Sequence, residues 1–415
     1  MRVLQISSLY PPKMLGGAEV SARNLSELLV DDGHEVLVVR ACDRDEDEGE
    51  EITPSNIRIV RLKTPHIYPV FRFYEASPLK KPLWHLQDHF DPSLRRKFGR
   101  VLDEFAPDLV NIHLLQGLGY PLLMEISKRR IPVNYVLPDL GLACIRMSMF
   151  KNGKDCGSQC LPCKASARYK LHLIRKQASI SFVSPSRANR ETLARYFPVQ
   201  DYPNSVILNP NTYPKPNITR TESETLRLLY AGRMHDSKGI DILLEAVEAL
   251  AKTHPITLTL AGQGQQEEEL RSRFGGASWC SFLGFISHAE LADRMMESDL
   301  LCIPSIWAEN SPGVVIQALG NGVPVMGSNR GGIPELVRDG HNGRLVSNMT
   351  AEGWRDALER VLVDRSLLSG WRQNAVAETK SFDSAEIGKK MKAWMEASTA
   401  GIVPAKGCLN NFPDS

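Results

Sequence analysis

The sequence predicts an α/β protein made of two Rossmann-like domains that face a central cleft. Two observations carry this prediction. Short apolar runs alternate with amphipathic helical stretches twice along the chain, before and after a Pro-rich polar segment. The length of 415 residues also exceeds what one hydrophobic core usually supports. Strands that alternate with helices pair in parallel and form doubly wound sheets.

The first alternation covers residues 1–208. Its apolar runs are typical of buried strands: VLQIS (3–7), HEVLVVRA (34–41), NIRIVRL (56–62), DLVNIH (108–113) and PVNYVL (132–137). Between the first two runs, apolar residues recur at helical spacing over 18–32, and Gly33 ends the predicted helix.

The second alternation covers residues 225–384 and follows a polar linker at 209–224. Its strand-like runs are LRLLYAG (226–232), ITLTLAG (256–262), WCSFLG (279–284), DLLCIPS (299–305) and VPVMGS (323–328). A last amphipathic helix is predicted over about 385–400, and its pattern fits packing on either domain. Ligands of open α/β sheets bind beyond the carboxyl ends of the strands, so we expect the site in the cleft.

Composition excludes several classes of protein. Hydrophobic residues make up 42% and charged residues 24%, as in ordinary globular proteins. No apolar run reaches the ~18 residues of a membrane span, and the first residues lack a signal-peptide pattern. We therefore expect a cytoplasmic protein with mostly reduced cysteines. The basic residues form no recognised nucleic-acid-binding module, so nucleic acid is not an expected partner.

Gly16 and Gly17 separate the first predicted strand from the first predicted helix. Glycines there let the backbone approach a ligand, and a helix N-terminus offers N–H groups to a phosphate. A plain turn is the alternative interpretation. The loop lacks the GxGxxG pattern of dinucleotide-binding turns, which disfavours a nicotinamide cofactor.

A stronger phosphate-binding pattern opens the second half. The strand at 226–232 ends at Gly232-Arg233, and Lys238 follows at the start of the next helix. Two cations at the carboxyl end of a strand can neutralise a diphosphate that gains charge as a bond to it breaks. A lysine is otherwise unfavourable at the positive end of a helix, which favours a binding role over a plain surface position.

Further candidates follow the strand at 299–305. Glu309 begins a tight loop, and a helix is predicted to start near Pro312. The first N–H groups of that helix could hold phosphate oxygens, and the Glu309 carboxylate could accept hydrogen bonds from sugar hydroxyls. An acidic loop that only caps a helix is the alternative. The donor-side candidates here are Asn310, Ser311, Gly313, Val314 and, for a ribose, Gln317.

Four of the eight cysteines are clustered in the pattern C-x11-C-x3-C-x2-C. They are Cys144, Cys156, Cys160 and Cys163. Four thiols this close in sequence could form a tetrahedral structural zinc site. Free thiols or a redox pair are the other interpretation, and the sequence leaves both open.

Aromatic residues alternate with Lys and Arg between His66 and Phe90, and further basic residues occupy 168–176. Such a surface could lie on the inner face of a membrane and receive a lipid-linked sugar. An ordinary insertion packed on the domain accounts for the same pattern.

These segments together resemble glycosyltransferase family 4, which has the GT-B fold. The matching segments are, in order, LYPPKMLGGAEV, PDLVNIH, AGRMHDSKGIDILLEAV, LAGQGQQEEEL, NGVPVMGSNRGGIPELV and NGRLV. They are spread over most of the chain, and their combination is specific although no single segment is.

The resemblance implies a retaining enzyme that moves a sugar from a nucleoside diphosphate sugar to a glycan or lipid-linked acceptor in cell-surface polysaccharide synthesis. It implies no catalytic metal or other cofactor. Arg233 and Lys238 match the diphosphate-binding pair of the family. Glu309 matches the first glutamate of its E-x7-E motif, which contacts the donor sugar. His113 matches a histidine that reaches the sugar from the N-terminal domain.

The chain departs from the family pattern at three places. Gln317 replaces the second glutamate of the motif, which weakens ribose binding by roughly 1 kcal/mol. The sequence Asn-Ser-Pro at 310–312 replaces a Gly-rich one. Pro138-Asp139 replaces a His-Asp pair, so that only Asp139 remains as an acceptor-side candidate.

Two alternative functions share this fold. A catalytically silent scaffold that binds nucleotide or a partner is favoured by Gln317 and by the absent histidine at position 138. A sugar-nucleotide epimerase would also place an arginine near a diphosphate. It is not expected to combine the patterns GR-x4-KG and E-x7-Q that this chain contains.

Overall fold

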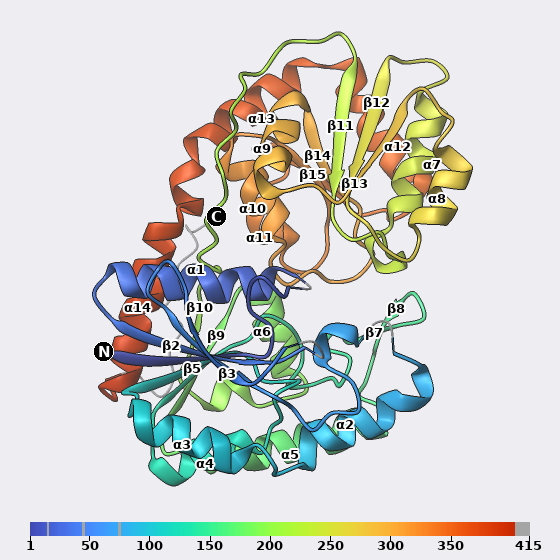
Figure 1. Cartoon of the computed structure of the whole chain (residues 1–415). Helices are drawn as coiled ribbons and strands as arrows, with labels where there is room; N and C mark the ends of the chain where they lie inside the picture. The colour runs from blue at the N-terminus through green and yellow to red at the C-terminus, as the bar shows by residue number, and fades with distance from the viewer. Residues whose placement is uncertain (15, 44–45, 74–75, 403–415) are drawn as a thin grey trace. The chain divides into compact units, whose positions relative to one another are not determined.

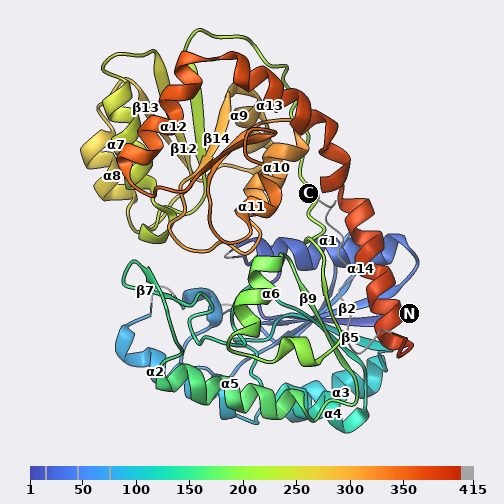
Figure 2. The same ribbon diagram turned by 180° about the vertical axis from the view of Figure 1, so that it is seen from behind.

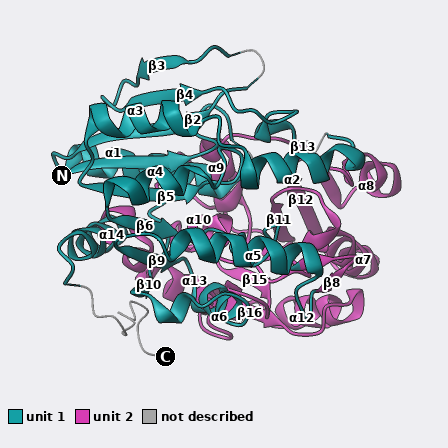
Figure 3. Ribbon diagram, turned by 90° about the horizontal axis from the view of Figure 1, so that it is seen from below, with its two compact units in different colours: residues 1–149, 156–211, 387–415 teal, residues 150–155, 212–386 magenta. Residues whose placement is uncertain are grey.

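The computed structural model describes residues 1–14, 16–43, 46–73 and 76–402. The chain divides into two compact units, coloured separately in Figure 3. Unit 1 contains residues 1–149, 156–211 and the chain from 387 onward. Unit 2 contains residues 150–155 and 212–386. Residues 207–225 form no helix or strand.

Unit 1 is built on an eight-stranded sheet with the order β10-β9-β6-β5-β1-β2-β4-β3. Neighbouring strands are parallel except for β3, which pairs antiparallel with β4. The strands are β1 (Arg2–Ser7), β2 (Glu35–Ala41), β3 (Gly49–Ile52), β4 (Arg58–Leu62), β5 (Leu109–Leu114), β6 (Val133–Val136), β9 (Ile180–Ser184) and β10 (Asn204–Val206).

Side chains alternate between the two faces of this sheet and fill two cores. Val36 and Val38 of β2 contact the core that includes α1 (Gly17–Asp31). Leu37 and Val39 contact the opposite core. Its helices are α3 (Arg95–Phe105), α4 (Leu122–Arg129) and α5 (Leu161–Ile174), which cover that face in Figure 1. Burial on both faces explains why the strands are continuous apolar runs in the sequence.

The C-terminal helix α14 (Ser384–Thr399) joins the core of unit 1 on the α1 side. Its apolar side chains are buried, and the indole Nε1 of Trp394 donates a hydrogen bond to Asn134 Oδ1 at 3.0 Å. The helix therefore packs on the sheet of unit 1. Its amphipathic pattern alone also allowed packing on the other unit.

The remaining described elements of unit 1 surround the sheet. They are α2 (Lys81–Phe90), α6 (Arg187–Ala194) and the 3-10 helices η1 (Val70–Arg72), η2 (Pro78–Lys80) and η3 (Val199–Asp201). Trp84 is fully buried, with its ring 5.1 Å from that of Phe73 and its Nε1 donating to the Tyr68 carbonyl at 3.0 Å. Much of the aromatic segment is therefore a packed insertion.

Unit 2 contains a six-stranded, fully parallel sheet with the order β13-β12-β11-β14-β15-β16. Its strands are β11 (Leu226–Ala231), β12 (Ile256–Ala261), β13 (Cys280–Gly284), β14 (Leu300–Ile303), β15 (Val325–Ser328) and β16 (Gly343–Val346). Two very short strands, β7 (Phe150–Lys151) and β8 (Lys154–Asp155), form a separate hairpin.

Helices cover both faces of the unit 2 sheet. In the two opposite views of Figure 1 and Figure 2, α7, α8 and α12 lie on one face and α9 and α10 on the other. The described helices of this unit are α7 (Ile240–Leu250), α8 (Glu267–Phe274), α9 (His288–Glu297), α10 (Gly313–Gly320), α11 (Ile333–Leu336), α12 (Ala351–Val363), α13 (Ser366–Ala377) and the 3-10 helices η4 (Asp236–Lys238) and η5 (Thr379–Phe382).

The predicted α/β class and all ten predicted strands are confirmed. Four strands of the two sheets were not predicted: β3, β9, β10 and β16. Within the described parts of the chain, no helix combines the length and apolar character that crossing a bilayer requires.

Candidate functional site

The two predicted phosphate-binding cations lie on one loop of unit 2. Arg233 and Lys238 both fall between β11 and α7, at the carboxyl end of the sheet's central strand. Arg233 is exposed, and its carbonyl accepts a hydrogen bond from the Tyr230 hydroxyl at 3.0 Å. Gly232, with φ of +155°, separates Arg233 from the strand. The structure therefore places both cations where the sequence predicted them.

The loop that carries Lys238 packs tightly against the loop that follows β14. Gly239 has φ of +62°, and a Cβ at this position would clash with the Pro304 carbonyl oxygen. The Ile306 N–H donates to the Ser237 carbonyl at 3.0 Å. Only glycine allows this approach. The approach joins two loops whose strands, β11 and β14, are neighbours in the sheet.

Across this junction, Lys238 is paired with Glu309. The Lys238 ammonium Nζ donates to Glu309 Oε1 at 2.5 Å, and the Ser305 hydroxyl donates to the same oxygen at 2.6 Å. Glu309 is buried, with 7% of its surface exposed. Burial alone would raise the pKa of this carboxyl, but the Lys238 ammonium and the Ser305 hydroxyl bring it below its ordinary value. The site thus contains a carboxylate and an ammonium in contact.

A second glycine fixes the backbone of Glu309. The Gly332 N–H donates to the Glu309 carbonyl at 2.6 Å. Gly331 has φ of +58°, and a Cβ there would clash with that carbonyl oxygen. The Gly-Gly sequence between β15 and α11 therefore holds Glu309 in place. These two glycines belong to the segment NGVPVMGSNRGGIPELV, but the sequence alone does not reveal their contact with Glu309.

The donor-side candidates after Glu309 line the entry to α10. Asn310, Ser311, Gly313 and Val314 are half-buried, and the Ser311 hydroxyl oxygen has no hydrogen-bond partner among the described residues. Helix α10 begins at Gly313 after Pro312, whose side chain provides no cap. The first N–H groups of a helix lack partners within it, so they remain suited to a phosphate oxygen.

Gln317 is buried and makes two contacts with one residue that the sequence did not single out. Its Nε2 donates to the His288 carbonyl at 3.1 Å, and its Oε1 lies 3.3 Å from His288 Nδ1. A glutamate cannot donate to that carbonyl. The amide at this position therefore matches His288, at the start of α9, and both of its polar groups are engaged there.

The glycine loop of unit 1 starts a helix. Gly16 is the N-cap residue of α1, and its N–H donates to Glu19 Oε2 at 3.1 Å. Gly17 is exposed, and a Cβ there would meet no atom within 4 Å. Glu19 is buried, so the start of α1 already contains a carboxylate bound to the Gly16 N–H. The open space at Gly17 would let a ligand approach the backbone closely.

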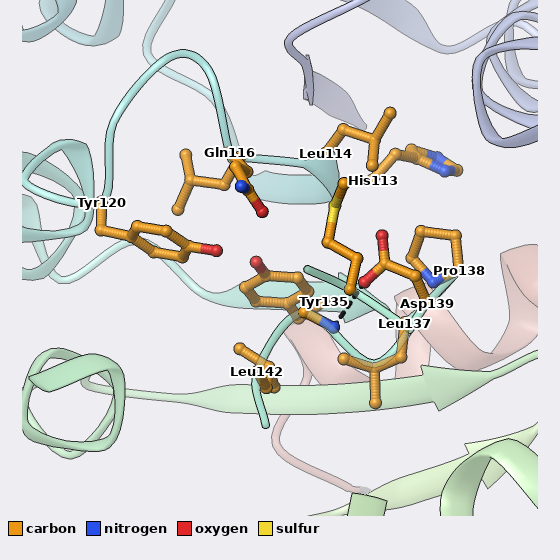
Figure 4. Close-up of a pocket in the computed structure, with 12 residues that line it drawn as sticks. His113, Leu114, Gln116, Tyr120, Tyr135, Leu137, Pro138, Asp139 and Leu142 are labelled. Atoms are coloured by element: carbon orange, nitrogen blue, oxygen red, sulfur yellow. Dashed lines mark hydrogen bonds between the residues drawn. The ribbon is translucent and has the colours of Figure 1, made fainter. Parts of the chain in front are cut away.

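His113 and Asp139 line one pocket of unit 1, although they come from different strand ends (Figure 4). Asn111 Nδ2 lies 3.0 Å from His113 Nε2, and His113 Nδ1 has no hydrogen-bond partner among the described residues. Burial lowers the pKa of His113 to about 3, so its imidazole is neutral at pH 7. Asp139 Oδ1 accepts the Gly141 N–H at 2.6 Å, and burial raises the pKa of Asp139 to about 6.

The pocket also contains polar groups that the sequence did not reveal. In Figure 4 the Gln116 amide and the hydroxyls of Tyr120 and Tyr135 point toward one another. Gln116 Oε1 is buried without a hydrogen-bond partner among the described residues. Lys170, one of the basic residues of 168–176 that could have formed an interfacial surface, is buried, and its Nζ donates to the Gly141 carbonyl at 2.7 Å. Burial lowers the pKa of Lys170 to about 8.

The four clustered cysteines differ in burial and in their contacts. In the described part of the chain, no three or more His, Cys, Asp or Glu side chains are gathered where they could hold a metal ion. Cys144 and Cys163 are neighbours, with their Sγ atoms 3.9 Å apart, whereas Cys160 is exposed. The zinc site expected at Cys144, Cys156, Cys160 and Cys163 stays a prediction.

Two family models match the chain, one in each unit. Residues 15–137 match the model described as Glycosyltransferase Family 4. Residues 225–364 match the model described as Glycosyl transferases group 1. The second match includes Arg233, Lys238 and Glu309.

Several relatives cover most of the chain. An uncharacterised 42.6 kDa protein in the cps region of Klebsiella pneumoniae is 26% identical over 339 residues, which are 81% of this chain and 88% of that protein. A glycogen synthase of Mycobacterium tuberculosis is 25% identical over 385 residues, which are 88% of this chain and 86% of the synthase.

Solved structures with the same fold cover nearly the whole chain. Sucrose-phosphate synthase from Thermosynechococcus elongatus has a TM-score of 0.72 at 17% identity and covers 97% of this chain and 100% of its own. Anabaena Alr3699/HepE, solved in complex with UDP and glucose, has a TM-score of 0.68 at 19% identity, with 96% and 100% covered. At these identities the likeness establishes the fold alone.

Proposed function

We propose that this chain, which belongs to glycosyltransferase family 4 and is an enzyme of the GT-B type, transfers a sugar from a nucleoside diphosphate sugar to a glycan or lipid-linked acceptor with retention of configuration. The process served would be cell-surface polysaccharide synthesis, in line with the cps-region relative. The observation that carries the proposal is the contact between Lys238 and Glu309 beside Arg233.

The donor is assigned to unit 2. A diphosphate carries two or more negative charges and needs fixed cations, which Arg233 and Lys238 supply on one loop. The N–H groups that begin α10 add a partial positive charge. Glu309 then accepts hydrogen bonds from sugar hydroxyls, because the two oxygens of a carboxylate can accept more hydrogen bonds than those from Lys238 and Ser305. The UDP and glucose of the Anabaena complex are ligands of the same class.

In the proposed reaction, negative charge gathers on the diphosphate as its bond to the anomeric carbon breaks. The anomeric carbon becomes oxocarbenium-like, and Arg233 and Lys238 stabilise the leaving group. The acceptor hydroxyl attacks from the face that the diphosphate leaves and gives its proton to the departing phosphate, so the configuration is retained. Side-chain cations supply the charge compensation, and the proposal contains no catalytic metal ion or other cofactor.

The acceptor is assigned to the pocket of unit 1. Gln116 Oε1 is a buried polar atom of this pocket that lacks a partner among the described residues, and such an atom is stabilised by a ligand that bonds it. Asp139 lines the same pocket. Because the imidazole is neutral at pH 7, His113 would act as a hydrogen-bonding group rather than as a cation.

A peripheral membrane contact is part of the proposal. Four apolar side chains at helical spacing are exposed along η2 and α2: Leu79 at 90%, Leu83 at 50%, Leu86 at 56% and Phe90 at 57%. Lys80 and Lys81 adjoin them. An exposed apolar stripe beside basic residues suits an anionic lipid surface.

Flotation with vesicles tests this contact. The wild-type chain should float with anionic vesicles and less with neutral ones, and the double variant Leu83→Ser/Leu86→Ser should remain at the bottom. Val363→Ser is the matched control, because Val363 is 80% exposed in unit 2. Equal flotation of the wild type and the double variant would reject the contact.

The proposed reaction is tested with purified chain, a panel of UDP, GDP and ADP sugars, and a bacterial lipid extract as acceptor. Acceptor-dependent release of nucleoside diphosphate is expected, with a product anomer, read by NMR, that matches the donor. An inverted product would contradict retention. Conversion of the nucleotide sugar without acceptor would indicate an epimerase, and nucleotide binding without any turnover would indicate a silent scaffold.

A further inference from the structure

Three cysteines of unit 1 form a thiol cluster, defined as Cys144, Cys160 and Cys163. Cys144 and Cys163 are both buried, with their Sγ atoms 3.9 Å apart. A disulfide requires about 2.05 Å, so the two sulfurs are close neighbours that are not bonded. Cys160 is exposed and stands three positions before Cys163 at the start of α5. One thiol is therefore accessible and two lie behind it.

The position of Cys160 favours thiolate chemistry. It is the N-cap residue of α5, a helix of 14 residues, and the sequence Cys-Leu-Pro-Cys runs into that helix. A helix N-terminus and a C-x-x-C arrangement both favour the thiolate, which is the form that attacks disulfides.

The position of Cys144 favours a buried sulfur that can carry negative charge. The Arg146 N–H donates to Cys144 Sγ at 3.3 Å. The Cys163 thiol donates to the same sulfur at 3.9 Å. A structural cysteine packed among apolar groups would lack these donors, as Cys302 does in β14, where burial raises the pKa of the thiol.

We propose that this thiol cluster is a redox-active site that exchanges disulfides with a low-molecular-weight disulfide of the glutathione type. The Cys160 thiolate attacks one sulfur of the external disulfide, forms a mixed disulfide and releases one thiolate. Cys163 passes its proton to the Cys144 sulfur that it contacts, attacks Cys160 Sγ and releases the second external thiolate, which takes up that proton. Cys144 then attacks Cys163 Sγ and displaces the Cys160 thiolate. Two protein thiols are oxidised and one external disulfide is reduced to two thiols.

The final Cys144–Cys163 disulfide would act on the pocket of unit 1. Cys144 lies in the segment that supplies Gly141, Leu142 and Met147 to the pocket wall. Cys163 lies on α5, which already holds that segment through the Lys170 bond to the Gly141 carbonyl. Oxidation would therefore connect the pocket wall covalently to α5. This site is distinct from the proposed donor site in unit 2.

The experiment follows disulfide formation in the full chain. Reduced protein is exposed to oxidised glutathione, quenched with N-ethylmaleimide at set times, digested without reduction and analysed by mass spectrometry. We expect one internal disulfide per chain, linking Cys144 to Cys163. Cys160→Ser should form it about tenfold more slowly, because the accessible thiol is lost. Cys144→Ser should stop at a Cys160–Cys163 disulfide.

Cys156→Ser is the control, because Cys156 lies in the same cysteine-rich segment but is not one of the three thiols of the proposed exchange, so its loss should leave the rate unchanged. Thermal melts of each variant show whether it is folded. If Cys144→Ser does not fold, the comparison of Cys160→Ser with Cys156→Ser still decides, since Cys160 is exposed. No internal disulfide in the wild type, or equal rates in those two variants, would overturn the proposal. One zinc ion per purified chain that blocks alkylation until it is chelated would also overturn it.

Discussion

The Lys238 ammonium and the Glu309 carboxylate are in direct contact, with Nζ 2.5 Å from Oε1, although 71 positions separate them in the sequence. The contact joins the loop after β11 to the loop after β14. These two strands are hydrogen-bonded neighbours in the sheet. The proposed cation for a diphosphate and the proposed acceptor for sugar hydroxyls are thereby held together before any ligand binds. Such preorganisation is what stabilisation of a charged leaving group requires.

Glu309→Gln should destabilise unit 2 in a pH-dependent way. The folded-state pKa of Glu309 is lowered, so its stabilising effect is present above the ordinary pKa and is lost as pH falls through the lowered value. The free energy of unfolding, measured with urea at pH 7, should fall by about 1–3 kcal/mol. The difference from wild type should shrink below about pH 4. Asp236→Asn, an exposed acid on the neighbouring loop, should cause no such change.

Lys238→Ala should weaken turnover of the donor. Loss of one charge-assisted hydrogen bond to a diphosphate corresponds to about 1.5–3 kcal/mol, or roughly tenfold to a hundredfold in kcat/KM. Arg233→Ala should lower kcat/KM at least about tenfold for the same reason. Steady-state kinetics with the active donor sugar measure both effects. Lys252→Ala, an exposed lysine after α7, is the control, and near wild-type turnover in Arg233→Ala would reject its role.

Gln317→Glu should lower the free energy of unfolding of unit 2. A glutamate cannot donate to the His288 carbonyl, so about 1–2 kcal/mol should be lost near pH 8.

Urea unfolding near pH 8 measures the loss of stability in the Gln317 variants. Gln317→Met removes both bonds to His288 without adding charge, so it should also lose about 1–2 kcal/mol. Wild-type stability in both variants would contradict the assigned contact.

Trp394→Phe should destabilise unit 1, because it removes a hydrogen bond to the buried side-chain amide of Asn134. The Trp394 indole and the Ser181 hydroxyl both donate to Asn134 Oδ1, and Asn134 Nδ2 donates to Asn111 Oδ1 at 2.6 Å. Phenylalanine keeps the apolar contacts of α14 but removes one donor, which should lower the free energy of unfolding by about 1–2 kcal/mol. Chemical denaturation measures the effect. Lys390→Ala, exposed on the same helix, should change it little.

The class of fold could be predicted because buried parallel strands are continuous apolar runs, and VLQIS and ITLTLAG were recognised on that basis. The strand GEEI (β3) was missed because it is an acidic edge strand that lacks such a run. GRLV (β16) is a short edge strand with two partly exposed positions, so its pattern is weak.

The sequence indicates which residue types belong to the candidate site, but it does not indicate which partners they contact. Glycines and cations near strand ends indicated a phosphate site from local sequence. The pairing of Lys238 with Glu309 and that of Gln317 with His288 depend on which strands are neighbours, and no local pattern contains that order. The burial of Lys170 also could not be predicted from local sequence. Its basic neighbours suggested a surface position, but Lys170 lies on the buried side of α5.

Isothermal titration of the full chain with UDP, GDP and ADP tests the central claim most directly. At least one of these nucleoside diphosphates should bind to the wild type at a single site. Its affinity should fall at least about tenfold in Lys238→Ala and stay unchanged in Lys252→Ala. The account would be contradicted if no nucleoside diphosphate bound, or if Lys238→Ala and Arg233→Ala bound it as tightly as the wild type.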